Sequence, residues 1–347
     1  MMIDKVAIFS DLHLGLKQDS PVWHEIALEW CEWFVRELKK RDVDTVVFLG
    51  DFFHTRNNIS ANTLHVASKV LDMMKDFKLH IILGNHDLYY ANEPTVSPVN
   101  LFQGRNNITV YTKPEKVDLY NGCDAVFCGW GYNPLDFRAN ILFTHAEINI
   151  FRYNTDVDTC NSGHKASDLT SNYDLVYSGH FHLKQEKKWN NKRISYVGNP
   201  FSMDHSDNYQ TLKGFDILDL KTLESEFVEN TISPKFYKVY LSELVSGKWS
   251  YDELERVIDG NIFKVIIDLN ITPADTNILN GLISQYKPLE YTLEWENGKS
   301  FSQEISEVEL RVFDMEDAIQ KYIELLDIPN KAEVTEYVLR LYEKAQS

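Results

Sequence analysis

Five short apolar segments of this chain are each followed by a cluster of Asp, His or Asn residues, the side chains that bind divalent cations and transfer protons. In chain order, the clusters are Asp11-Leu12-His13, Gly50-Asp51-Phe52-Phe53-His54, Gly84-Asn85-His86-Asp87, Thr144-His145 and Gly179-His180-Phe181-His182. Loops at the carboxyl ends of strands in an open α/β sheet converge on one crevice, where ligands bind. We therefore expect these side chains to meet at one site.

The donor types in the clusters limit which ion could bind there. They offer carboxylate, amide and imidazole groups without a thiolate, a mixture that suits manganese, iron or zinc better than calcium, magnesium or an iron–sulfur cluster. The chain has 35 basic and 52 acidic residues, a formal net charge of −17, which argues against a broad basic surface for nucleic acid. Bound divalent cations would supply the local positive charge that a phosphodiester substrate needs.

Each motif also has a structural explanation when it is taken alone. A lone Asp-x-His is a weak signal, and Gly-Asp after a strand occurs in ordinary turns. Gly-Asn-His-Asp and Gly-His-x-His are harder to explain in this way, because such polar residues are unfavourable at buried strand ends unless they bind something. The occurrence of all five clusters, each after an apolar segment, favours a functional site. The other histidines, for which we expect surface or packing roles, are His24, His65, His80, His164 and His205.

The segments that carry the clusters read as alternating strands and helices at first and mostly as strands later. Strands and helices alternate over 6–9, 22–38, 45–49, 64–77 and 79–83, where the helices show apolar residues at helical spacing. Further strands are predicted at 108–111, 125–128, 141–144, 175–178, 194–197 and 214–218. The polar stretch 149–170 is predicted as a long loop. The pattern predicts an α/β fold, a four-layer sandwich of two packed mixed β-sheets flanked by helices.

The pattern of predicted strands and helices changes after Ser233-Pro234. A small α+β domain is predicted from strands at 236–241, 263–270 and 291–296 and helices at 251–258 and 276–285. Two amphipathic helices are predicted at the C-terminal end, at 315–326 and 331–344, separated by Ile328-Pro329-Asn330.

Composition places the chain among ordinary globular proteins of more than one domain. It has 347 residues, of which 44% are hydrophobic and 25% charged. Its apolar runs are strand-sized, so we expect no membrane span and no signal peptide. Its four cysteines form no Cys-x-x-Cys pair, which favours free thiols and a cytoplasmic location.

The ordered set Asp-Leu-His, Gly-Asp-Phe-Phe-His, Gly-Asn-His-Asp, Thr-His and Gly-His-Phe-His resembles the calcineurin-like, two-metal phosphoesterases over roughly residues 3–220. The histidine that ends Gly-Asp-Phe-Phe-His resembles the SbcD-type nuclease subunits, as do Tyr196-Val197-Gly198-Asn199-Pro200 and Lys213-Gly214-Phe215. Size and C-terminal organisation are similar to the recombination endonuclease subunits of T-even-type bacteriophages. The resemblance implies a nuclease domain at 1–230, a cap or DNA-binding domain at 235–300 and a partner-binding helix–loop–helix at 303–347.

The resemblance also implies roles for the clustered residues. One divalent ion, with manganese expected, would be held by Asp11, His13, Asp51 and His182. A second would be held by Asp51, Asn85, His145 and His180. His86 would then be the acid beside the leaving oxygen, with Asp87 holding its other ring nitrogen. His54 would contact a substrate phosphate or, alternatively, support a metal ligand.

The function implied is a DNA exonuclease and endonuclease that acts on double-stranded ends and single strands in repair or recombination. Its expected partners are a coiled-coil ATPase of the SbcC type, to which the C-terminal helices would dock, and a second copy of the chain in a homodimer. Two alternatives stay open: a stand-alone phosphatase or small phosphodiesterase with the same metal site, and a non-catalytic scaffold subunit.

Overall fold

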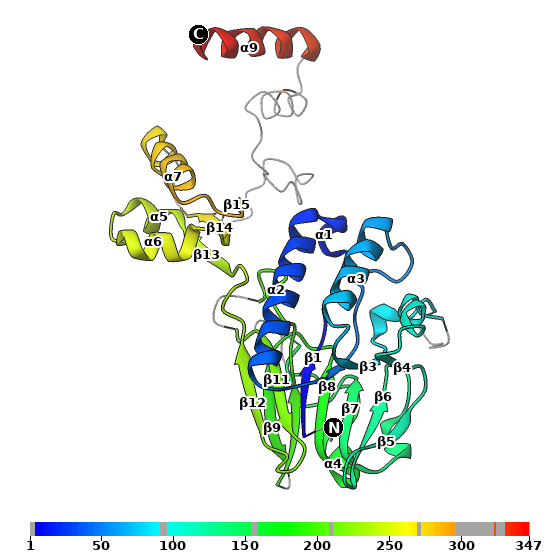
Figure 1. Ribbon diagram of the computed structural model, residues 1–347. Coiled ribbons are helices and arrows are strands. Elements are labelled where there is room, and N and C mark those ends of the chain that lie inside the picture. The colour runs from blue at the N-terminus through cyan, green and yellow to red at the C-terminus, as the bar shows by residue number, and fades with distance from the viewer. Residues whose placement is uncertain are drawn as a thin grey trace. The chain divides into compact units, whose positions relative to one another are not determined.

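The computed structural model describes residues 4–90, 96–153, 159–189, 191–207, 211–268, 272–295, 323 and 330–346 (Figure 1). Contacts within the chain divide it into two units, Met1–Phe236 and Tyr237–Ser347. The first unit contains all the residues of the predicted site.

Three of the five clusters follow parallel strands of the first sheet of unit 1. Its strand order is β12-β11-β1-β2-β3-β4. Four strands run parallel: β1 (Lys5–Phe9), β2 (Thr45–Phe48), β3 (Lys78–Ile82) and β4 (Ile108–Tyr111). Two antiparallel strands complete it, β11 (Gly214–Asp219) and β12 (Ser225–Glu229). Clusters that follow parallel neighbours such as β1, β2 and β3 necessarily emerge at the same edge.

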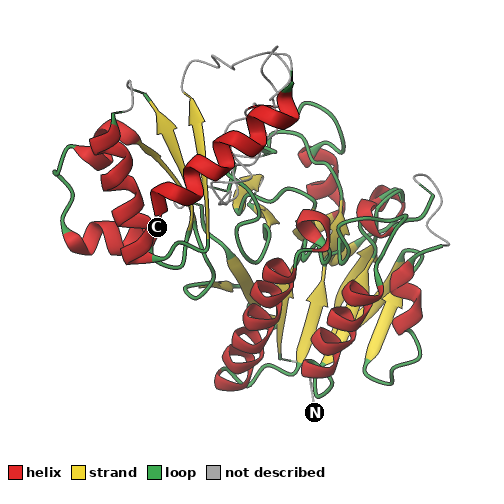
Figure 2. Ribbon diagram, turned by 90° about the horizontal axis from the view of Figure 1, so that it is seen from above, coloured by secondary structure: helices red, strands yellow, loops and turns green. Residues whose placement is uncertain are grey.

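Two long helices connect these parallel strands and cover the sheet. Helices α2 (Pro21–Lys40) and α3 (Ala61–Met73) lie side by side in both views (Figures 1 and 2). Helix α2 buries a stripe of large residues that includes Trp23, Trp30 and Phe34. Trp30 and Phe34 stack on each other and pack against Phe9 of β1. The apolar residues found at helical spacing in the sequence therefore form the face of the helix that packs on the sheet.

The second sheet of unit 1 carries the remaining two clusters. Its strand order is β5-β6-β7-β8-β10-β9. Its strands are β5 (Glu115–Tyr120), β6 (Cys123–Cys128), β7 (Ala139–His145), β8 (Tyr173–Gly179), β9 (Gln185–Trp189) and β10 (Lys192–Tyr196). The inner four run parallel, and β5 and β9 are antiparallel edges. Residues of both sheets, such as Ile8, Val47, Phe127, Phe143 and Tyr177, form one buried core between them. The predicted sandwich of two mixed sheets with flanking helices is confirmed.

The structure adds elements that sequence patterning did not predict. Strands β5, β9 and β12 were absent from the prediction, and α4 (Ala166–Asn172) lies inside the predicted loop. All three strands lie at sheet edges and are largely exposed. An edge strand with little buried surface lacks the apolar pattern by which strands are recognised.

Unit 2 is built on a small three-stranded sheet of order β13-β14-β15. Its elements are β13 (Phe236–Tyr240), α5 (Leu241–Val245), α6 (Tyr251–Ile258), β14 (Ile262–Ile267), α7 (Pro273–Tyr286), β15 (Glu290–Trp295) and α9 (Lys331–Gln346). Apart from α5, these elements match the predicted strands and helices. Of the predicted helix 315–326, only Ile323 lies among the described residues. No helix in the described part of the chain is long and apolar enough to cross a membrane.

Candidate metal centre

Main-chain hydrogen bonds fasten the loops after β1 and β2 to each other. The amides of Asp11 and His13 donate to the carbonyls of Gly50 and Asp51, each at 3.0 Å. Asp11, His13 and Asp51 adopt left-handed backbone conformations, with φ of 55°, 48° and 59°. Such conformations are unfavourable for residues with a Cβ and are concentrated at functional sites. The loops are thus held in a geometry that turns their side chains toward one another.

Asp11, His13 and His182 form the first cluster of potential ligands. Their donor atoms all lie within 4.8 Å of one another. The Nε2 atoms of His13 and His182 are 3.1 Å apart, and Asp11 Oδ1 lies 3.9 and 4.0 Å from them. Donors bonded to one cation at about 2.0–2.2 Å are separated by no more than roughly 4.4 Å. This cluster has the spacing of ligands around a single ion.

Asp51, His145 and His180 form the second cluster. Asn85 joins it, because its Oδ1 is 3.0 Å from both His145 Nε2 and His180 Nδ1. His145 Nδ1 donates to the carbonyl of Leu49 at 2.7 Å, which directs its Nε2 into the cluster.

Asp51 belongs to the second cluster and also lies close to the first. Its Oδ2 is 3.7 Å from His13 Nε2 in the first and 3.4 Å from His145 Nε2 in the second. A carboxylate in this position can bridge two cations. All seven residues predicted to bind metal are therefore brought together, as the sequence led us to expect.

The pKa shifts of the buried aspartates and histidines are those expected of a cation-binding site. Burial raises the pKa of Asp11. Burial has the same tendency at Asp51, yet His145 and His13 hold the pKa of that carboxyl well below its usual range. Burial lowers the pKa of His13, and it lowers that of His180 to about 3, so both imidazoles are neutral at physiological pH. Buried carboxylates require compensating charge, and neutral imidazoles beside them are suitable ligands. The residues present fit a pair of divalent ions.

His86 and His54 lie at the edge of the clusters. The amide of His86 donates to Asp51 Oδ1 at 2.8 Å, and its Nδ1 donates to the carbonyl of His54 at 2.6 Å. The ring centroid of His54 is 5.6 Å from that of His13 and 5.9 Å from that of His86. Its Nδ1 has no hydrogen-bond partner among the described residues. His86 is thus oriented by its neighbours, whereas the half-buried ring of His54 carries a buried nitrogen that no described residue uses.

The structure corrects the expected contact between Asp87 and His86. The buried carboxylate of Asp87 accepts hydrogen bonds from the amides of four residues, at 2.8–3.2 Å: Asp51, Phe52, Phe53 and Gly84. Asp87 is the last residue of a short 3-10 helix, Asn85–Asp87, whose turn directs its side chain back beneath the loop after β2. The prediction that Asp87 holds the ring of His86 is therefore wrong; Asp87 holds the backbone that carries Asp51.

The sequence profile of the calcineurin-like phosphoesterases matches residues 4–217. The chain belongs to this family. It is 26% identical over 284 residues to exonuclease subunit 1 of Enterobacteria phage T4, covering 79% of this chain and 80% of that protein. Among solved structures, it is similar to an archaeal phosphodiesterase, with a TM-score of 0.37, 15% identity and coverage of 65% of this chain and 99% of that one. A dimetal phosphatase from Danio rerio has a TM-score of 0.38 and 10% identity, with coverage of 62% and 92%.

In this calcineurin-like phosphoesterase, further residues lie near the candidate metal centre that were not expected there from the sequence. The ring of Trp130 lies 4.9 Å from that of His180, and Glu147 Oε1 lies 3.7 Å from His180 Nε2. Both residues follow strands of the second sheet, Trp130 just after β6 and Glu147 just after β7. Their positions after strand ends were a signal that could have identified them. Lys213, which contacts the backbone of His182, follows no strand, and the sequence marked it only as the first residue of the Lys213-Gly214-Phe215 motif.

Proposed function

We propose that this protein is a two-metal DNA phosphodiesterase that acts as an exonuclease and an endonuclease. The observation that carries the proposal is the position of Asp51 between two clusters of ligand atoms, with His86 bonded to the same carboxylate. In this proposal Asp11, His13, Asp51 and His182 hold one ion. The second ion is held by Asp51, Asn85, His145 and His180.

Two divalent ions held by these residues would activate water, bind the phosphate oxygens and stabilise the charge of the transition state. Manganese is the ion we propose, because the donors are a mixture of carboxylate, amide and imidazole. The protein's own groups supply the rest of the chemistry. The Nδ1–H group of His86 donates to the carbonyl of His54, so Nε2 is the atom that would deliver a proton to the leaving oxygen.

DNA is the substrate that we propose, and His54 is the residue that contacts it. The similarity to a phage exonuclease subunit supports this choice. The half-buried ring of His54 lies beside those of His13 and His86, so a strand that contacts it would place its phosphate near the metal centre. We propose that unit 2 acts as a cap that helps to hold the DNA.

A coiled-coil ATPase of the SbcC type is the partner that we propose for repair or recombination in the cytoplasm, with a homodimer of this chain in the complex. The C-terminal region 301–347 has eleven acidic and five basic residues, which suits a basic protein surface better than DNA. Val334 and Val338 lie four residues apart on α9 and are half-buried, the spacing of one helix face.

The test is cleavage by the purified chain with manganese, using linear duplex DNA and a small chromogenic phosphodiester as substrates. We expect cleavage of the DNA. Cleavage of the small ester alone would instead support a stand-alone phosphodiesterase, and turnover of neither would support a non-catalytic scaffold.

A further inference from the structure

His182 is a metal ligand in our proposal, yet its ring is poorly enclosed. Its side chain is 32% exposed, whereas the side chain of His13, opposite it in the first cluster, is 4% exposed. Packing therefore contributes less to the orientation of His182 than to that of His13. The backbone of His182 must be held firmly if Nε2 is to stay 3.1 Å from the His13 nitrogen.

The main chain of His182 is held by a segment that follows β10. Its carbonyl accepts one hydrogen bond from Lys213 Nζ at 2.9 Å and another from the amide of Asn199 at 3.3 Å. Gly198, at a φ of 77°, lies so close that an added Cβ would be 2.8 Å from the carbonyl oxygen of His182. Only glycine fits here without displacing the ligand-bearing backbone.

Lys213 is buried as part of a closed polar cluster. Its Nζ also donates to Asp207 Oδ1 at 2.5 Å and to Asn199 Oδ1. Asp207 Oδ2 in turn accepts from Asn199 Nδ2 at 2.8 Å and from the amide of Met203 at 3.0 Å. Lys213, Asp207 and Asn199 are all buried. A buried ion pair with its hydrogen bonds satisfied is geometrically specific, because any displacement leaves a charge uncompensated.

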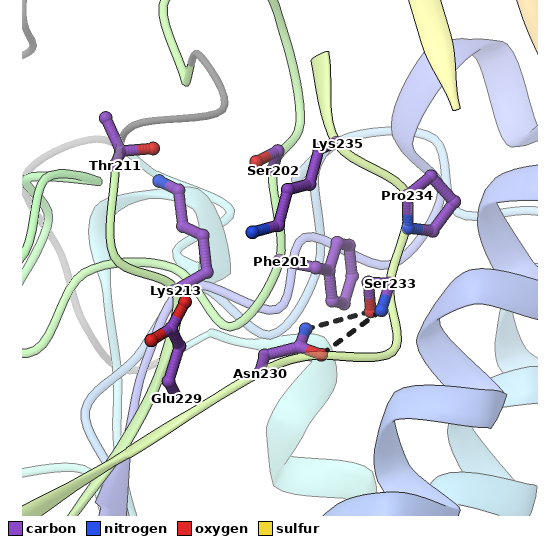
Figure 3. A pocket seen from close by; sticks show the side chains of 9 residues that line it. All are labelled: Phe201, Ser202, Thr211, Lys213, Glu229, Asn230, Ser233, Pro234 and Lys235. Atoms are coloured by element: carbon purple, nitrogen blue, oxygen red, sulfur yellow. Dashed lines mark hydrogen bonds between the residues drawn. The ribbon is translucent and has the colours of Figure 1, made fainter. Parts of the chain in front are cut away.

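The main chain of Lys213 is tied down as well. Its carbonyl accepts from the amide of Asn230 at 2.7 Å, and Asn230 Nδ2 donates to the carbonyl of Pro200 at 2.9 Å. Figure 3 shows Lys213 and Asn230 among the side chains that line a pocket, with Asn230 bonded to Ser233. Both the main chain and the side chain of Lys213 are therefore held by hydrogen bonds, so its ammonium group can fix the position of the His182 carbonyl.

We infer that Lys213, together with Asn199 and Asp207, is a positioning group that sets the affinity of the ion bound through His182. The inference rests on the proposed metal centre and assigns a role to the Tyr196–Pro200 and Lys213–Phe215 motifs. Groups that orient a metal ligand from behind typically change metal affinity about 10- to 100-fold when they are removed.

The test uses the full chain with Lys213→Met and Asp207→Asn combined, because Lys213→Met alone would leave a buried carboxylate without its cation. Manganese binding is followed by calorimetric titration, and folding by circular dichroism. We expect one of the two binding steps to weaken by at least about tenfold while the other keeps its wild-type affinity. Excess manganese should restore cleavage, since the ligands themselves remain.

The matched control is Lys184→Met with Asp216→Asn. This second Lys–Asp pair of the same unit has its Nζ and Oδ2 atoms 2.5 Å apart, and Lys184 Nζ also donates to Ser195 Oγ at 3.1 Å. The control should lose stability but bind both ions as the wild type does. A third variant, His182→Ala, should lose the same binding step, and adding the Lys213 and Asp207 changes to it should have no further effect on affinity.

Two results would overturn the inference. Wild-type affinity for both ions in the folded Lys213 and Asp207 double variant would show that the cluster is only structural, as would an equal loss in the Lys184 control. These outcomes leave the proposed function standing. A wild-type chain that binds fewer than two manganese ions would instead overturn the proposed metal centre, and the inference with it.

Discussion

The Nδ1 atom of His86 is 2.6 Å from the main-chain carbonyl oxygen of His54. A carbonyl only accepts hydrogen bonds, so this contact keeps a proton on Nδ1 and directs Nε2 toward the metal centre. Because the bond uses the backbone of His54, replacing the His54 side chain leaves His86 in place. The two histidines can therefore be tested separately.

His86→Ala should keep both ions and lose cleavage by about 10²- to 10⁴-fold, the usual contribution of a general acid. The ions should stay because His86 contacts the carboxylate of Asp51 through its amide, which alanine retains. Metal analysis and DNA cleavage measured on the same sample provide the test. Loss of an ion from this variant would make the His86 side chain structural.

His54→Ala should reduce degradation from DNA ends more than internal cutting of single strands. Its ring lies at the edge of the clusters, where it can orient a nucleotide without taking part in bond cleavage. The rates on a linear duplex and on a circular single strand, measured side by side, test the division. An equal loss of the two activities contradicts it.

Asp87→Asn should lower the free energy of unfolding by about 1.5–3 kcal/mol, the contribution of hydrogen bonds to a charged group. An amide has a single acceptor oxygen, whereas the carboxylate of Asp87 receives four amide groups through both oxygens. Urea unfolding measures the change. Unaltered stability combined with lost cleavage would return Asp87 to a direct role in catalysis.

Manganese binding should release a proton from His145 below about pH 9. Burial lowers the pKa of His145, but the carboxylates of Asp51 and Asp11 more than offset this effect and raise the pKa to about 9. The ion-free protein therefore holds a proton that must leave before Nε2 can bind a cation, and affinity should rise with pH until that pKa is passed. Calorimetry in two buffers of different protonation enthalpy counts the proton. Binding that is independent of pH between 7 and 9 would contradict the assignment.

Deleting residues 303–347 should abolish co-purification with the partner ATPase while leaving manganese binding and basal cleavage intact. The point variant Val338→Asp, at a half-buried position of α9, should weaken the association, and Lys331→Ala, at an exposed position of the same helix, is the control. A truncated chain that binds the ATPase at full affinity would exclude this region as the docking site.

Much of the metal centre could be predicted from the sequence alone. The clusters after β1, β2 and β3 come together because parallel neighbouring strands end at the same edge of their sheet. Those after β7 and β8 join them because the second sheet packs face to face on the first. Buried strands and amphipathic helices carry their pattern in the sequence, and so do motifs at their ends.

The partners of individual polar groups depended on the tertiary structure. Asp87 adjoins His86 in sequence, yet a single 3-10 turn directs its carboxylate to the backbone of the loop after β2. Lys213 lies 31 residues after His182 and contacts its carbonyl, to which the amide of Asn199 also donates, and the sequence gives no sign of this contact. The polar edge strands β5 and β9 were missed for a related reason: their pairing is specified by main-chain hydrogen bonds, which leave little trace in side-chain type.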